Sequence, residues 1–148
     1  MPKSNGQKHS NAAEASIDEE FHAILSSISN KCSQVQLPML LTTVGEIISY
    51  VGERNYNTDE FITHALSTLR LSREFVKIMN LRDVRSFRVR GIRDTILAVY
   101  VISENIVLAF YCHVESKYYA LYSSKELDND MKPILDLIRS KISTVLPG

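Results

Sequence analysis

The longest apolar stretch of this chain constrains its fold more than any other feature of the sequence. It covers Ile96–Val114 and is interrupted once, at Ser103–Asn105. A membrane-spanning helix needs about 20 consecutive apolar residues, so the interrupted stretch is a poor candidate for one. Its halves, Ile96–Ile102 and Ile106–Val114, are rich in the β-branched and aromatic residues that strands prefer. Because Asn105 tolerates the left-handed backbone of a tight connection, the stretch predicts a β-hairpin.

Three further segments carry the signature of strands. Residues 35–41 and 86–90 alternate apolar side chains with others, as a strand with one buried face does. Residues 47–51 return after a turn in which Gly45 is free to take a positive φ. Pro38 lacks the N–H that a sheet ladder uses, so we expect the first strand to lie at an edge or to begin after this proline.

Three segments are predicted to be helical. Residues 16–30 start with Ser16 in a capping-box spacing, and residues 57–81 carry the longest helical periodicity. Residues 130–145 have Pro133 in the first turn, where a proline is tolerated. The apolar stripe of the long central helix is predicted to contain Ile62, Leu66, Leu69, Val76 and Met79, with Phe61 and Ala65 beside it.

These elements follow one another in the order α-β-β-α-β-β-β-α. The predicted fold is therefore α/β of the α+β kind: a five-stranded, mostly antiparallel sheet with a long central helix and a C-terminal helix. At 148 residues the chain has the length of one domain. Residues 1–15 are polar and without apolar periodicity, so we expect a flexible tail followed by a domain over residues 16–146.

Charge and cysteine content limit the partners and the compartment. Seventeen basic residues balance seventeen acidic ones, so the chain has no net field that would attract nucleic acid. The two cysteines, Cys32 and Cys112, have no metal-ligand spacing, which suits reduced thiols in a cytoplasmic protein.

One local concentration of charge needs an explanation. Its members are Arg82, Arg85, Arg88, Arg90 and Arg93. Such a basic strip could bind an acidic partner, phosphoinositide head groups or RNA. A solvated strand face, whose arginines also discourage stray edge pairing, is the interpretation that we favour.

No group of residues in the sequence has the pattern of a catalytic centre. Cys112 and His113 are adjacent, so in a strand they point to opposite faces and cannot form a nucleophile–base pair. Glu60 and His64 share a helix face, but one such pair is more often a surface contact than a metal site. The glycines fit turns, and no phosphate-binding Gly-Lys-Ser/Thr occurs. We therefore expect no enzymatic activity, no cofactor and no metal.

The order of elements resembles that of the Roadblock/LC7 family over roughly residues 16–145. Residues Leu40–Tyr50 resemble the first hairpin of that family, Ser86–Arg90 its third strand, and Ile106–Phe110 its apolar last strand. The closing helix makes the chain most similar to the Roadblock subunits of the Ragulator/EGO complex. That resemblance implies a non-catalytic scaffold that pairs with another Roadblock subunit and supports Rag-type small GTPases in nutrient (TORC1) signalling.

The resemblance also implies where partners bind and where the protein works. Roadblock domains typically pair through the central helix and the third strand. The candidate interface residues are therefore Thr68, Leu71, Ser72, Phe75, Phe87 and Val89. The alternative for the four apolar members is that they belong to the core. The implied location is cytoplasmic, at the surface of a late endosome, lysosome or vacuole, with the membrane reached only through a lipidated partner.

Three other functions stay open. A dynein-type light chain would link a motor to cargo as a homodimer, although that class generally lacks a C-terminal helix. Some prokaryotic Roadblock homodimers have a GTPase-activating effect, but the sequence names no residue for it. A longin- or profilin-like trafficking domain mixes a similar sheet and helices differently, and the capped helix before the first strand counts against it.

Overall fold

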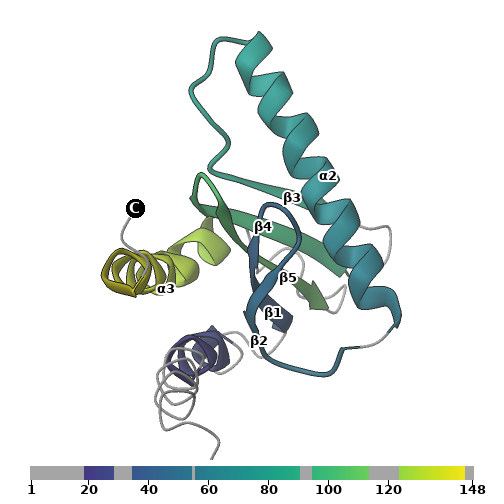
Figure 1. Cartoon of the computed structure of the whole chain (residues 1–148). Helices are drawn as coiled ribbons and strands as arrows, with labels where there is room; N and C mark the ends of the chain where they lie inside the picture. The colour runs from purple at the N-terminus through teal and green to yellow at the C-terminus, as the bar shows by residue number, and fades with distance from the viewer. Residues whose placement is uncertain (1–18, 29–34, 55, 91–94, 114–123, 146–148) are drawn as a thin grey trace, which may run out of the picture.

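A computed structural model describes residues 19–28, 35–54, 56–90, 95–113 and 124–145. Residues 19–28 form a helix, drawn in purple in Figure 1. The other elements are β1 (Val35–Thr42), β2 (Ile47–Tyr50), α2 (Tyr56–Ile78), β3 (Ser86–Arg90), β4 (Thr95–Ser103), β5 (Ile106–His113) and α3 (Ser124–Val145). The predicted order of elements and the α+β fold class are confirmed. The predicted tail and capping residue Ser16, together with Cys32 and Arg93, lie outside the described residues.

The five strands form one antiparallel sheet in the order β2-β1-β5-β4-β3. The β4–β5 hairpin turns at Glu104 and Asn105, as its sequence predicts. The β1–β2 hairpin turns through Gly45, whose φ is 99°. Pairing of β1 with β5 joins the two hairpins, and this leaves β2 and β3 at the two edges of the sheet.

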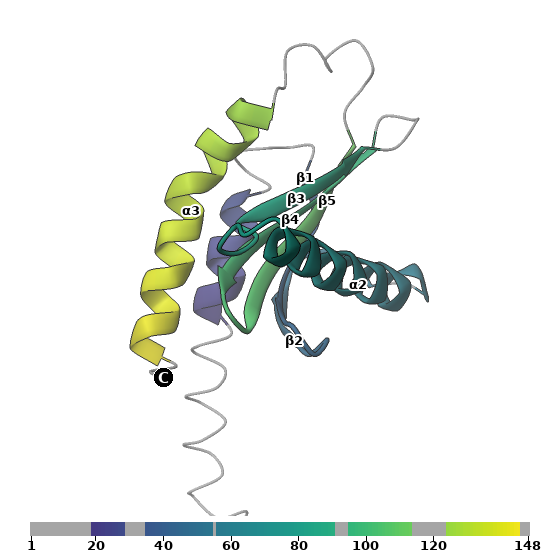
Figure 2. The same cartoon turned by 90° about the horizontal axis from the view of Figure 1, so that it is seen from above.

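Helices cover both faces of this sheet. The helix α2 crosses one face, and α3 and the helical residues 19–28 lie against the other (Figures 1 and 2). Neighbouring residues of a strand point to opposite faces. In β4, for example, Val99 packs under α2 while Ala98 and Tyr100 pack on the α3 side. The central strands are therefore apolar on both sides.

The structure corrects the expectation for the strand that contains Pro38. β1 lies between β2 and β5, so it is not at an edge, and it begins at Val35 rather than after the proline. The register with β5 shifts between Gln36 and Met39, and Leu37 adopts a φ of 49°. The proline thus falls in a β-bulge, where the ladder is already interrupted and its missing N–H removes no regular bond.

The central helix α2 ends three residues before the predicted position. Asn80 has a φ of 57°, and its backbone N–H donates to the carbonyl of Lys77 at 3.2 Å. The N–H of Leu81 donates to the carbonyl of Val76 at 2.8 Å. This pair of bonds is a Schellman motif, with asparagine in the left-handed position that glycine usually occupies. The periodicity therefore continues past the point where the backbone closes the helix.

The C-terminal helix α3 begins six residues earlier than predicted, at Ser124 rather than at Asp130. Pro133 consequently lies inside the helix instead of in its first turn. A proline removes one backbone hydrogen bond from a helix interior. The turns that precede it are held in place by Leu127 and Met131, which are completely or almost completely buried.

An apolar core holds α3 and the helical residues 19–28 to the sheet. The buried face of α3 consists of Leu127, Met131, Ile134, Leu135, Ile138 and Ile142. These side chains lie in one cluster with Phe21, Leu25 and Ile28, and an ion pair of 3.1 Å joins Lys141 to Glu20 nearby. The three-to-four-residue spacing of these α3 side chains is that of one face of a helix.

Adjacent residues of α3 test this packing. Replacing Ile138, which is fully buried, by alanine should lower the free energy of unfolding by about 2–5 kcal/mol, because it leaves a cavity in the core. The same replacement at Leu137, which is 49% exposed, should cost less than about 1 kcal/mol. Urea unfolding followed by circular dichroism measures both. Equal losses from the two variants would contradict the packing of α3 described above.

Candidate partner-binding site

The helix α2 carries a row of exposed apolar side chains beside its buried face. Leu71, Phe75 and Ile78 are 67%, 61% and 79% exposed. They are four and three residues apart, so they lie above one another on the same side of the helix. The face that packs on the sheet is a different one and includes Ile62, Ala65 and Leu69. The exposed row is therefore no extension of the core stripe.

The loop and the strand that follow α2 carry further exposed apolar side chains. Met79, Leu81 and Val89 are also large, apolar and about half exposed. Together these six residues form what we call the α2–β3 patch: Leu71, Phe75, Ile78, Met79, Leu81 and Val89. Six of the nine exposed large hydrophobic residues in the described part of the chain belong to it. Such a concentration is typical of an interaction surface.

Strand β3 adds an open sheet edge to this patch. Within the described residues β3 pairs with β4 alone, because it is the outermost strand of the sheet. In an antiparallel sheet, every second residue of an edge strand turns its N–H and C=O groups outward. Those groups can form a ladder with a strand of another chain. The patch and the open edge therefore offer apolar area and backbone hydrogen bonds at the same place.

The six predicted interface residues all lie on the α2 side of the sheet. Leu71, Phe75 and Val89 are exposed, so the alternative that they belong to the core of this chain is wrong for these three. Phe87 is half-buried and packs against the cluster under α2. Thr68 and Ser72 are half-buried between the exposed row and the buried face. Whether these residues bind a partner stays a prediction.

For three residues of the patch, the prediction from the sequence was wrong or absent. Met79 was assigned to the core stripe, but it is 57% exposed because the helix ends at Ile78 and the turn carries Met79 away from the buried face. Ile78 and Leu81 were assigned to no surface. The spacing of Ile78, seven residues after Leu71 and three after Phe75, is the signal that could have placed it in the row.

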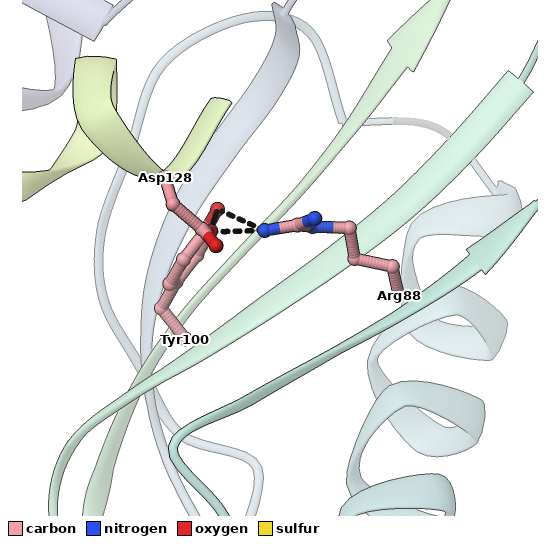
Figure 3. Close-up of polar contacts among 3 residues, drawn as sticks. All are labelled: Arg88, Tyr100 and Asp128. Atoms are coloured by element: carbon pink, nitrogen blue, oxygen red, sulfur yellow. Dashed lines mark hydrogen bonds and ion pairs between the residues drawn. The ribbon is translucent and has the colours of Figure 1, made fainter. Parts of the chain in front are cut away.

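Behind the open edge, a polar network ties β3 and β4 to α3 (Figure 3). The Arg88 guanidinium donates to the Tyr100 hydroxyl at 3.1 Å and forms an ion pair with Asp128. The Tyr100 hydroxyl donates to Asp128 Oδ1 at 2.8 Å. Each of the three residues belongs to a different element, so the network links the outermost strand to the helix on the far face.

This network corrects the interpretation of the basic strip as a solvated strand face. The Arg88 side chain is only 18% exposed, and it points toward α3 instead of into solvent. Arg82 and Arg85 are exposed, whereas the Arg90 side chain and Arg93 lie outside the described part of the chain. The strip is therefore divided between an internal contact and the surface. Sequence reasoning missed the network because Asp128 is 40 residues away along the chain.

Tyr100 is the buried centre of the network. Its ring stacks on Phe110 with centroids 6.0 Å apart, and the Arg88 guanidinium lies 5.9 Å from its centroid. Burial raises the pKa of the Tyr100 hydroxyl well above its usual range, and the hydrogen bond that it donates to Asp128 raises that pKa further. The folded protein therefore keeps this hydroxyl protonated, which lets it donate to the carboxylate.

The described residues contain no group of three or more His, Cys, Asp or Glu side chains placed to hold a metal ion. Cys112 is buried in the core, and Glu60 and His64 are both exposed on α2. No helix among those described is both long and apolar enough to cross a membrane. The partner surface is thus the feature on which a function can be argued.

Comparison with known proteins identifies the fold. No protein-family profile matches the chain, and no curated protein sequence matches it. Solved structures do match. A Roadblock/LC7 domain from Streptomyces avermitilis is 19% identical with a TM-score of 0.67, and the alignment covers 80% of this chain and 94% of that one. MglB from Myxococcus xanthus is 13% identical with a TM-score of 0.70, covering 85% and 97%. A further match, MglB with a tetrameric arrangement, is 12% identical with a TM-score of 0.72, and the alignment covers 88% of this chain and 93% of that one. The chain therefore has the Roadblock/LC7 fold.

Because the Tyr100 hydroxyl stays protonated in the folded protein, we predict how the free energy of unfolding depends on pH. Its pKa is raised in the folded protein relative to the ordinary value of 10.0, so the stability that it contributes is fully present below pH 10 and is lost as the pH rises further. The free energy of unfolding of the wild type should therefore fall more steeply above pH 10 than that of Tyr100→Phe. Urea unfolding at a series of alkaline pH values measures the free energy of unfolding of both proteins. Because the other titrating groups are the same in both, their contributions cancel when one free energy is subtracted from the other. Parallel curves would contradict a hydroxyl held protonated by burial.

Proposed function

We propose that this chain is a non-catalytic scaffold subunit that pairs with a second Roadblock-type domain and supports a small GTPase. The observation that carries the proposal is the coincidence of the α2–β3 patch with the open edge of β3. A partner with the same fold would bring a matching helix and a matching edge strand. Two sheets would then join through β3 while two α2 helices lie side by side.

The energetics of the patch support an obligate partner. Burying each large apolar side chain stabilises a complex by about 1.5–3 kcal/mol. Aromatic anchors such as Phe75 carry a large share of the binding energy in many interfaces. A ladder along β3 would satisfy backbone groups and fix the register. We therefore expect the isolated chain to be poorly behaved and to gain stability from its partner by mass action.

The finer proposal concerns the kind of partner and the place of action. The closing helix α3 supports a likeness to the Roadblock subunits of the Ragulator/EGO complex. On this proposal the partner is another Roadblock subunit, and the pair supports Rag-type GTPases in nutrient signalling. The complex would work in the cytoplasm at the lysosomal or vacuolar surface, with a lipidated partner providing the membrane anchor.

A second candidate is a homodimer that regulates a GTPase directly. Similarity to MglB with a tetrameric arrangement favours a self-associating chain. A dynein-type light chain has less support, since the long α3 distinguishes this chain from that class. The nature of the partner separates these candidates.

The first test compares partners of the wild type and of a patch variant. The tagged full-length chain is purified at its natural expression level, and the co-purifying proteins are identified by mass spectrometry. We expect a second Roadblock subunit together with Rag-type GTPases. The double variant Leu71→Asp with Phe75→Asp should weaken pairing at least roughly a hundredfold, because two buried apolar contacts are lost. Sedimentation of the purified pair measures that change.

Leu137→Asp is the matched control. It replaces one apolar side chain of α3, 49% exposed and outside the patch, by aspartate, and so adds one negative charge where the double variant adds two. This variant should keep the partners of the wild type. Self-association without another Roadblock chain would favour the homodimer, and recovery of dynein chains would favour the motor light chain. A monomer without any Roadblock or GTPase partner would overturn the proposed function.

A further inference from the structure

A polar groove lies between the outer strands of the sheet and α3, on the opposite face from α2. Its volume is about 450 Å³. We call it the β3–α3 groove; its lining residues on the strand side are Arg85, Ser86 and Tyr100. The lining residues on α3 include Asp128, Asn129, Lys132, Asp136 and Arg139. Two of these lining residues, Tyr100 and Asp128, belong to the polar network with Arg88 that Figure 3 shows.

Both carboxylates in the groove are already paired. Asp128 accepts from Tyr100 and forms the ion pair with Arg88. Asp136 lies 3.7 Å from Arg139, the guanidinium of which also donates to the backbone carbonyls of Val101 and Ile102. Their charges are therefore balanced within the fold. The charge that a ligand would meet in the groove therefore depends on the other charged groups.

The other charged groups in the groove are two cations. Arg85 and Lys132 are exposed, and among the described residues neither side chain forms an ion pair. Arg85 comes from the strand side and Lys132 from α3, so they reach the groove from its two walls. Ser86 and Asn129 add neutral hydrogen-bond donors in the same lining. The groove thus has a net positive charge and a set of donors.

We infer that the β3–α3 groove binds an acidic segment of a protein partner, with Arg85 and Lys132 as the anchoring cations. Carboxylates bound between the two walls would neutralise Arg85 and Lys132, the two cations that form no ion pair among the described residues. The paired Asp128 and Asp136 line the groove as well, and they disfavour a continuous polyanion such as RNA or an anionic lipid surface. Spaced carboxylates on a flexible segment can avoid these two groups. This surface lies on the other face of the sheet from α2, so the inference does not rest on the proposed dimer.

The test uses the full chain, isotopically labelled for NMR, and a peptide in which glutamate alternates with glycine. A peptide with glutamine in place of glutamate is the uncharged probe. We expect saturable shifts of the backbone amides of Arg85, Ser86, Asn129 and Lys132 with the glutamate peptide alone. The interaction should weaken as salt is raised from about 0.05 M to about 0.5 M, because the groove is open to solvent.

Charge reversal at the anchors is the decisive comparison. Arg85→Glu with Lys132→Glu should weaken binding by roughly tenfold or more, since two exposed ion pairs become repulsions. Arg85→Lys with Lys132→Arg should retain it. The matched control is Arg70→Glu with Lys77→Glu, which makes the same change of charge on the exposed flank of α2 and should leave binding unchanged.

Several outcomes would overturn the inference. These are equal binding of the glutamine peptide, shifts confined to α2, loss of binding in the control variant, or no saturable shift at all. Tighter binding to phosphatidylserine vesicles or to an RNA oligonucleotide through the same two cations would identify a different class of ligand. Circular dichroism of each variant confirms that a loss of binding is not a loss of fold.

Discussion

The antiparallel pairing of β1 with β5 is the interaction on which the rest of this structure depends. It joins a hairpin from the first third of the chain to the β3–β4–β5 meander. The joined strands are apolar on both faces, with Leu40 and Leu108 on the α3 side and Met39 and Val107 under α2. A sheet of this kind is stable in water only when both faces are covered. The positions of α2, α3 and the helical residues 19–28 follow from that requirement.

The helix α2 is longer than the strand at the edge of the sheet. With 23 residues at about 1.5 Å each, α2 is about 35 Å long, whereas the five residues of β3 span only about 17 Å. The C-terminal part of α2 therefore runs past the sheet that its first part covers (Figure 1). On that part, Val76 still packs against the cluster under α2, whereas Phe75 and Ile78 lie on the exposed row. An interface is the simplest way to bury them.

The sequence predicted what depends on local pattern and missed what depends on distant contacts. Alternation and turn chemistry placed β3, β4 and β5 within a residue of their observed ends. They could not place Pro38 inside a central strand, because the bulge that accommodates it exists only when β5 lies beside β1. Periodicity identified the apolar residues of α2, but it could not tell Leu71 on an exposed row from Leu69 under the sheet without the other elements. Arg88 was placed at the surface for the same reason, since Asp128 meets it only after α3 has folded back.

Strand β3 lies between the α2–β3 patch and the β3–α3 groove, and its backbone and side-chain groups point in three directions. Its outer backbone faces a possible partner strand, and Phe87 packs toward α2. Arg88, the next residue, reaches the opposite face and joins Tyr100 and Asp128. A chain that pairs with the open edge would leave the β3–α3 groove accessible, because the groove lies on the other side of the sheet from the α2–β3 patch. On the proposed function, one outermost strand would serve a dimer at its edge and a second ligand on the face opposite α2.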